Sequence, residues 1–218
     1  MSLFSANHII CMDTIRGGLA VENPVLNEPG TVGFIGTSDG TDRWLVSCFH
    51  VLCRSLGTAM PPDARESVVY AFDGNQPARV LAVVDPTRAD DDLDCAAALV
   101  VKPAEALGQI LGVGTIHPEP IEAQVGMRVL KSGVATGVTE GFVRRLRVDG
   151  KPVMQIEKTS AGYAVCSRGD SGALWLDAQT LRPVALHTGG RADDERGVAV
   201  ATEIKAVLAR LGLRILSE

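Results

Sequence analysis

Residues 168–175 read Arg168-Gly169-Asp170-Ser171-Gly172-Ala173-Leu174-Trp175 in a chain of 218 residues. Gly, Asp and Ser are turn-forming residues, and the apolar run that follows them predicts a buried strand. A glycine two residues before a serine lets the backbone turn so that two N–H groups converge on one point. The stretch therefore has two interpretations: an ordinary polar turn, or a turn that presents Ser171 for nucleophilic attack.

Two motifs earlier in the chain contain the groups that would activate Ser171. A serine hydroxyl needs a base that accepts its proton during attack and returns it to the leaving group, and histidine does both. The histidine ring in turn needs a carboxylate that holds it in one tautomer. His50 lies in the apolar run at 44–52, and Asp94 directly precedes the apolar run at 95–100. We therefore predict that Ser171 is the nucleophile, His50 the base and Asp94 the orienting carboxylate.

The oxyanion that forms during attack needs fixed donors, and the N–H groups of Gly169 and Ser171 are the candidates. Each catalytic residue also has a simpler interpretation. His50 could be a core histidine with an internal hydrogen bond. Asp94 competes with the acidic run at 90–92, which reads as a solvated loop. These interpretations would have to hold together with an ordinary turn at the serine, so the three motifs jointly favour catalysis.

Two other classes of serine hydrolase require a different order or motif. An α/β-hydrolase has Gly-x-Ser-x-Gly, with its acid and histidine after the serine. Here Ala173 stands at the second glycine position, and the only histidine after the serine is His187. Subtilisins have the order Asp, His, Ser. Asp94 does not fit that order, whereas Asp13 precedes His50 and fits it by order alone.

With the order histidine, aspartate, serine, the chain resembles the trypsin-like serine proteases, and their bacterial branch more than the digestive enzymes. The resemblance covers about residues 15–212. Three further segments support the resemblance. Residues 30–36 are similar to the strand ahead of the histidine motif, and residues 131–141 to the family's Gly-x-x-Thr-Gly-x-x-x-Gly hairpin. Residues 186–190 are similar to the strand that binds substrate backbone.

The chain departs from this family at several positions. Phe49 precedes the histidine, where the family usually has Ala or Asn, and Ala173 stands where Gly or Pro is common. Cys48 and Cys53 lie too close to His50 to form the disulfide that secreted relatives have there. Neither Phe49 nor Ala173 is at a position that takes part directly in the chemistry.

The resemblance implies an all-β fold of two packed six-stranded antiparallel β-barrels with a C-terminal helix. The N-terminal barrel (1–105) would contain the histidine and the acid, residues 106–120 would cross between the barrels, and 121–218 would contain the serine and the helix. Strand-like runs between Gly, Asp and Pro turns agree with this division. They are 31–35, 44–47, 68–72, 78–84 and 95–101 in the first barrel, and 127–131, 139–148, 152–157, 173–176, 183–187 and 198–202 in the second. Apolar residues at helical spacing predict the terminal helix at 203–211.

By this resemblance the protein is expected to be an intracellular serine endopeptidase that cleaves peptide bonds through an acyl-enzyme. The alternative is a protease-fold binding or scaffold module without turnover. The peptide would pair as an extended strand with Thr188, Gly189 and Gly190. In glutamyl endopeptidases a histidine at the matching position binds an acidic side chain, which implies that role for His187. The alternative for His187 is an internal hydrogen bond.

The resemblance also implies a structural ion pair between Lys131 and Asp170. Digestive trypsins pair the aspartate before the serine with a newly cut N-terminus, and secreted bacterial relatives use a basic side chain in the hairpin instead. Lys131 stands at that position, so we expect activity without zymogen cleavage, although Ile15-Arg16-Gly17-Gly18 faintly resembles the cut site. The alternative is an exposed lysine.

Composition limits the partners and the location. A net charge of −5 and a pI near 5.4 argue against nucleic acid or an anionic membrane as partner. The first 20 residues contain no basic segment leading into a long apolar stretch, and five cysteines without paired spacing suit a reducing compartment, so we expect a cytoplasmic protein. Cys48-x-His50-x-x-Cys53 could be part of a metal site, but the triad uses His50 and no second ligand pair is evident. We therefore expect no metal and no cofactor.

Overall fold

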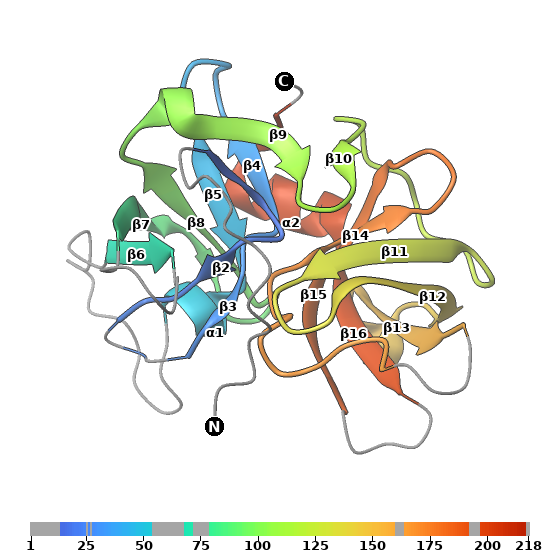
Figure 1. Cartoon of the computed structure of the whole chain (residues 1–218). Helices are drawn as coiled ribbons and strands as arrows, with labels where there is room; N and C mark the ends of the chain where they lie inside the picture. The colour runs from blue at the N-terminus through green and yellow to red at the C-terminus, as the bar shows by residue number, and fades with distance from the viewer. Residues whose placement is uncertain are drawn as a thin grey trace.

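The structure of the chain is a computed structural model that describes residues 14–24, 26, 28–53, 68–71, 79–159, 164–191 and 197–216. β-Strands provide most of its regular structure and lie in two groups, with helix α2 (Ile204–Leu211) between them (Figure 1). Among the described residues, no helix is both long and apolar enough to span a membrane. The predicted all-β class with a C-terminal helix is confirmed.

The first group is a six-stranded antiparallel sheet in the order β17-β4-β5-β8-β7-β6. Its strands are β4 (Phe34–Thr37), β5 (Trp44–Ser47), β6 (Val68–Ala71), β7 (Arg79–Asp90), β8 (Cys95–Val100) and β17 (Arg214–Ile215). The one-turn helix α1 (Phe49–Leu52) follows β5. The predicted strands correspond to these elements, except that Phe72 and Ala78 lie outside the described residues, as does Asp13.

The continuous apolar character of β8 has a structural cause. This strand lies between β5 and β7, which pair with its two edges, and along Cys95–Ala98 its two faces pack into different cores. Ala96 and Ala98 pack into the core of the first sheet, while Cys95 and Ala97 pack into a second core that also contains residues of the C-terminal half. A strand buried on both faces carries apolar residues at every position. Asp94 therefore stands where the buried part of β8, Cys95–Ala98, begins.

The second group is a closed barrel in the order β11-β12-β13-β16-β15-β14, with all neighbours antiparallel. Its strands are β11 (Arg128–Gly133), β12 (Gly137–Arg145), β13 (Val153–Lys158), β14 (Leu174–Asp177), β15 (Pro183–Arg191) and β16 (Val198–Glu203). Met154, Ile156 and Trp175 are buried in its core. All six strands coincide with predicted runs to within a few residues.

Two smaller sheets were not predicted as such. The segment expected to cross between the barrels, 106–120, follows the short helix η2 (Pro103–Glu105) and contains strands β9 (Ala106–Ile110) and β10 (Gly114–Thr115). These form a three-stranded sheet with β1 (Ile15–Gly17), which pairs with β9 in parallel. Strands β2 (Ala20–Val21) and β3 (Gly30–Thr31) form a separate pair.

A shared apolar core joins the two groups. It contains Phe34 and Val46 from the first sheet, Leu174 and Leu186 from the barrel, and Val207 from α2. After α2 the chain returns to the first sheet, where β17 pairs with β4. The sequence predicted the helix but not this last strand, which is only two residues long. Helix, strand and shared core hold the two groups in fixed contact, and the candidate site lies along the same boundary.

Candidate active site

His50 and Asp94 meet at the boundary between the two groups of strands. His50 lies in α1, and Asp94 ends the turn before β8 with a φ of 50°. His50 Nδ1 is 2.8 Å from Asp94 Oδ2 and 3.0 Å from Oδ1, and the His50 backbone N–H donates to Oδ1 at 3.0 Å. A positive φ is uncommon outside glycine, and aspartate is one of the residues that adopts it most easily. The turn thus directs the carboxylate at both the ring and the backbone of His50.

This contact sets the protonation behaviour of His50. Burial alone works to lower the pKa of the imidazole, but the hydrogen bond and the charge of Asp94 outweigh it and, with a contribution from Glu28, raise that pKa above its usual value of 6.5. Since Asp94 holds Nδ1, Nε2 is the ring nitrogen that remains to accept a proton.

The segment around Ser171 lies against the segment around His50. Cys48 Sγ is 3.1 Å from the carbonyl oxygen of His187, which also accepts the Gly172 N–H at 2.8 Å. Gly30 forms a second bridge, since a Cβ there would lie 2.5 Å from Val51 Cγ2 and 2.9 Å from the Ser171 carbonyl oxygen. Residues on both sides of His50 are therefore linked to the turn that contains the serine, Cys48 through His187 and Val51 through Gly30. Among the described residues, Ser171 Oγ has no hydrogen-bond partner, so no bond to His50 is formed in this state.

A buried carboxylate holds the Ser171 turn in place. Lys131 Nζ is 3.0 Å from Asp170 Oδ2, and both side chains are 0% exposed. Oδ2 also accepts the Thr136 hydroxyl at 2.7 Å and the Ser167 N–H at 3.0 Å. Oδ1 accepts the N–H groups of Ala135 and Thr136 at 3.0 and 3.2 Å. Burial works to raise the pKa of Asp170, but the Lys131 charge and these hydrogen bonds outweigh it and lower that pKa, so the carboxylate is ionised.

Thr31 braces the same turn from the other side, a role that the sequence alone did not indicate. Its N–H donates to the Ser171 carbonyl at 2.7 Å, and its hydroxyl donates to the Gly169 carbonyl at 2.7 Å. The hydroxyl also accepts the Val134 N–H at 3.1 Å, while the Thr31 carbonyl accepts the Ser47 hydroxyl at 2.8 Å. The quoted segment 30–36 contained Thr31, but its partners are more than 100 residues away in sequence, except for Ser47.

The two predicted oxyanion donors lie in this braced turn. Gly169 has a φ of 102°, which a residue with a side chain rarely adopts. Within the described part of the chain, neither the Gly169 N–H nor the Ser171 N–H donates a hydrogen bond. Both donors are thus available to an incoming oxygen atom.

Beside this turn, β15 has one unpaired edge. It pairs with β14 as far as Leu186 and with β16 along Ala185–Arg191. From Thr188 to Gly190 the β14 side has no strand partner among the described residues. Thr188 and Gly189 are partly exposed and Gly190 is exposed, and a Cβ at Gly189 would meet nothing within 4 Å. This edge can accept an extended peptide.

His187 lies behind that edge and is 1% exposed. Its Nδ1 accepts the Trp175 indole N–H at 3.4 Å, and the two rings meet edge to face. Burial, followed by the charge of Lys131, lowers the pKa of His187 to about 3. His187 is therefore neutral and internally hydrogen-bonded. Its predicted contact with an acidic substrate side chain stays a prediction.

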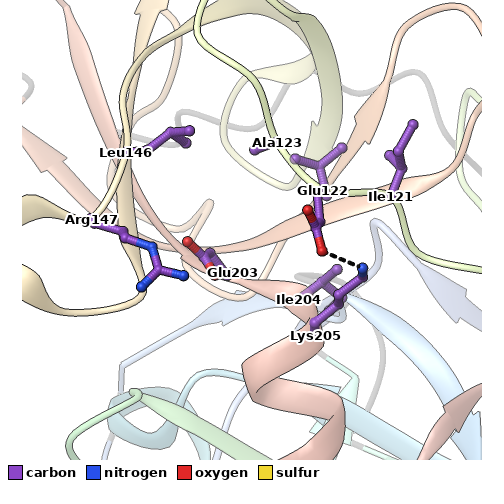
Figure 2. A pocket seen from close by; sticks show the side chains of 9 residues that line it. Ile121, Glu122, Ala123, Leu146, Arg147, Glu203, Ile204 and Lys205 are labelled. Atoms are coloured by element: carbon purple, nitrogen blue, oxygen red, sulfur yellow. Dashed lines mark hydrogen bonds and ion pairs between the residues drawn. The ribbon is translucent and has the colours of Figure 1, made fainter.

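Two further features complete the description of possible binding sites. Donor atoms of Cys48, His50 and Asp94 all lie within 4.8 Å of one another and are of the types that bind metals. A separate cavity of about 320 Å³ lies beside α2, and Figure 2 shows Arg147 and Glu203 at its rim together with the Glu122–Lys205 ion pair. None of the predicted site residues lines this cavity.

No protein-family model and no curated protein matches the sequence. Solved structures do match over nearly the whole chain. A glutamic acid-specific serine protease described as using a histidine triad in substrate binding is 19% identical, with a TM-score of 0.66, over 93% of this chain and 100% of its own. Nocardiopsis protease is 20% identical with a TM-score of 0.64, and Cellulomonas bogoriensis chymotrypsin is 20% identical with a TM-score of 0.60. Each of these two matches covers 94% of this chain and 100% of the other.

The chain has the chymotrypsin fold. At these low identities the match establishes the arrangement of strands, which confirms the fold predicted from the sequence. Within this chymotrypsin fold, His50 and Asp94 are in contact at the boundary between the first sheet and the barrel, and the turn that contains Ser171 is linked to the His50 segment through His187 and Gly30.

The buried Lys131–Asp170 pair predicts a large stability difference between two lysine substitutions. Lys131→Met leaves the Asp170 carboxylate buried without its cation, which typically costs about 3–5 kcal/mol of unfolding free energy. Lys102→Met removes a cation from an exposed pair with Glu105, which is worth about 0–1 kcal/mol. Urea unfolding followed by tryptophan fluorescence measures both values.

The loss of unfolding free energy in Lys131→Met should depend on pH in a direction that the pKa of Asp170 determines. Because Asp170 has a lowered pKa in the folded state, its contribution is present above the unfolded value near 3.8 and is lost as the pH falls through the folded value. The difference in unfolding free energy between Lys131→Met and the unmodified protein should therefore become smaller in acid. Equal costs for the two lysine substitutions at neutral pH would contradict the structural role of the pair.

The His50–Asp94 contact predicts a change in the pKa of His50. Asp94→Asn removes the charge that raises this pKa and leaves burial, which lowers it, so the imidazole should titrate at a lower pH than in the unmodified protein. Since folding raises the pKa of His50, the contact stabilises the fold most below about pH 6.5, and this contribution falls as the pH rises through the folded value. NMR titration of the imidazole measures the shift. An unchanged pKa in Asp94→Asn would show that the carboxylate does not control His50.

Proposed function

We propose that this protein is a serine endopeptidase that uses Ser171, His50 and Asp94. The observation that carries the proposal is the double contact of the Asp94 carboxylate with the ring and backbone of His50, directly beside the braced turn of Ser171. A histidine held at Nδ1 by a carboxylate is arranged to accept a proton at Nε2. The chymotrypsin fold supports this proposal, since many proteins with that fold are proteases, but the site itself is the basis for it.

The reaction proceeds in two balanced halves. Ser171 Oγ attacks the carbonyl carbon of the scissile bond while its proton moves to His50 Nε2, and the negative charge on the substrate oxygen is stabilised by the N–H groups of Gly169 and Ser171. His50 then gives that proton to the leaving amine, which departs and leaves an acyl-enzyme on Ser171. Water attacks the acyl carbon, gives a proton to His50, and releases the acid as Ser171 regains its proton. Asp94 stabilises the imidazolium in both halves.

The substrate class follows from the open edge of β15. A peptide in extended conformation would hydrogen-bond to the backbone of Thr188, Gly189 and Gly190 and continue the sheet toward Ser171. Gly190 lies against Cys166, since a Cβ at Gly190 would be 2.5 Å from the Cys166 sulfur. Glycine is thus required at position 190 by packing inside the protein, whereas a Cβ at Gly189 would meet nothing within 4 Å, so a peptide backbone can approach there. A protein or peptide is therefore the proposed partner, and the negative net charge makes nucleic acid a poor one.

Activation and location complete the proposal. Lys131 already supplies the cation that orders the turn at 169–171, so the site needs no newly cut N-terminus. Ile15, at the segment that faintly resembles a cut site, is buried and paired in β1. Cys48, Cys53, Cys95 and Cys166 are free thiols, which supports a reducing compartment such as the cytoplasm as the working location.

The proposed nucleophile can be tested by labelling. A fluorophosphonate should react covalently with Ser171, and Ser171→Ala should abolish both labelling and peptidase activity. His50→Ala and Asp94→Asn should lower turnover by about 10⁴-fold or more, because the three residues act as a unit. Ser38→Ala, a change at an exposed serine in the turn between β4 and β5, is the control and should label normally. Mass spectrometry locates the label.

The outcomes of this experiment separate the two candidate functions. Peptidase activity that survives in Ser171→Ala would refute the assignment of the nucleophile. A folded, unmodified protein that neither labels nor cleaves any peptide in a diverse library would support the alternative, a protease-fold binding module.

The burial of His187 predicts the outcome of a specificity measurement. A solved structure of the same fold belongs to a protease specific for glutamic acid, and the sequence predicted an acidic preference through His187. In this chain, however, His187 is neutral and bonded to Trp175. Paired peptides that differ only in Glu or Gln before the cut should therefore differ by less than about tenfold in kcat/KM, which corresponds to about 1.4 kcal/mol. A preference for Glu of about 100-fold or more would restore the acid-binding role.

A further inference from the structure

Cys48 occupies a position beside the triad for which the proposed mechanism has no use. It lies between β5 and α1, is 0% exposed, and its sulfur is 3.1 Å from the His187 carbonyl oxygen. The Cys48 sulfur, a ring nitrogen of His50 and a carboxylate oxygen of Asp94 all lie within 4.8 Å of one another. The sequence suggested Cys48, His50 and Cys53 as a partial metal site, whereas the structure replaces Cys53 by Asp94.

These three groups are the protein ligands that zinc prefers. Zinc binds thiolate, imidazole and carboxylate, at bond lengths of about 2.0–2.3 Å in tetrahedral geometry, which places ligand atoms roughly 3.5 Å apart. The ring nitrogen and carboxylate of the His50–Asp94 pair are already closer than this, at 2.8 Å. A modest widening of that pair and an approach of the sulfur would complete three ligand positions. Solvent would supply the fourth.

The ion has a route to these groups from solvent. The side chains of His50 and Asp94 are 37% and 24% exposed, so one side of the pair is open. Cys48, the third donor, is fully buried. Three donors that converge from different segments, with one open side, distinguish this cluster from a lone cysteine.

We propose that Cys48, His50 and Asp94 form an inhibitory binding site for a thiophilic divalent cation, for which Zn²⁺ is the probe. This proposal rests on the proposed peptidase function for its consequence, but not for the binding itself. Metal binding at Nδ1 uses the lone pair of that nitrogen, so the proton of the neutral ring resides on Nε2. The Cys48 thiol releases its proton to solvent. With Nε2 protonated and Asp94 held by the metal, His50 cannot accept the proton of Ser171, and turnover stops.

The first test measures inhibition. Zn²⁺ should inhibit peptide cleavage by the full chain, and a chelator should restore activity. Loss of even a supporting partner of a metal ligand typically weakens binding about 10–100-fold, so removal of a ligand in Cys48→Ala should raise the inhibitory Zn²⁺ concentration by at least about 100-fold relative to that variant's own metal-free activity. Cys48→Ser serves as a second variant, because its hydroxyl can still donate to the His187 carbonyl and maintain the fold. Cys53→Ser, a buried thiol outside the cluster, is the matched control and should keep the sensitivity of the unmodified protein.

The second test measures binding without turnover. Co²⁺ added to the Ser171→Ala protein should produce a cobalt–thiolate charge-transfer absorption, which Cys48→Ser in the same background should abolish and Cys53→Ser should not. If Zn²⁺ inhibits the Cys48 variants as strongly as the unmodified protein, or if the cobalt absorption does not depend on Cys48, the site is refuted. A cobalt signal that depends on Cys48 in a chain without peptidase activity would leave the metal site standing and refute the proposed function. Peptidase activity without the cobalt absorption and without Zn²⁺ inhibition would support the proposed function and refute the metal site.

Discussion

The buried ion pair between Lys131 and Asp170 is the contact on which the geometry of the site depends. Asp170 lies between the two residues whose N–H groups would stabilise an oxyanion, and its side chain is fully buried. A carboxylate in such a place must be satisfied by charge and hydrogen bonds. Its five donors come from Lys131, the hairpin that follows Lys131, and Ser167. Satisfying the carboxylate therefore fixes the path of the backbone around Ser171. Gly133 permits this approach, because a Cβ there would lie 2.3 Å from Asp170 Oδ1.

The remaining geometry comes from the contact between the two groups of strands. His50 and Asp94 belong to the first sheet and Ser171 to the barrel, so their relative positions depend on how the two halves pack. The shared apolar core and α2 set that packing. Thr31 links the first half to the turn that contains Ser171 through its hydrogen bonds to the carbonyl groups of Gly169 and Ser171. The core at this boundary contains the large side chains of Phe34 and Trp44, whereas β8 contributes the small residues Cys95 and Ala97 to it. A shift of one half against the other would separate the base from the nucleophile.

The arrangement that prepares a general base is also close to that of a metal site. Both require an imidazole oriented by a carboxylate in a partly enclosed position. In this chain the thiol of Cys48 lies within 4.8 Å of the pair. A small apolar residue at that position would leave only two good ligands. The residue at position 48 therefore decides whether a thiophilic cation can compete for the contact between His50 and Asp94.

The sequence by itself indicated the fold class through its resemblance to the trypsin-like proteases, and the apolar runs between turn residues agreed with the strands that this resemblance implies. It also identified His50, Asp94 and Ser171 as candidates, because each stands in a local motif whose residue types reflect its chemistry. The strand pairing of β9 and β17 was not predictable in this way. β17 is only two residues long, and the partners of β9 and β17, which are β1 and β4, lie far from them in sequence. The brace at Thr31, the pairing of His187 with Trp175, and the approach of Cys48 to Asp94 were decided only by the tertiary structure. Each depends on the distance between segments that separate strands bring together, and that distance is set by how the two halves pack.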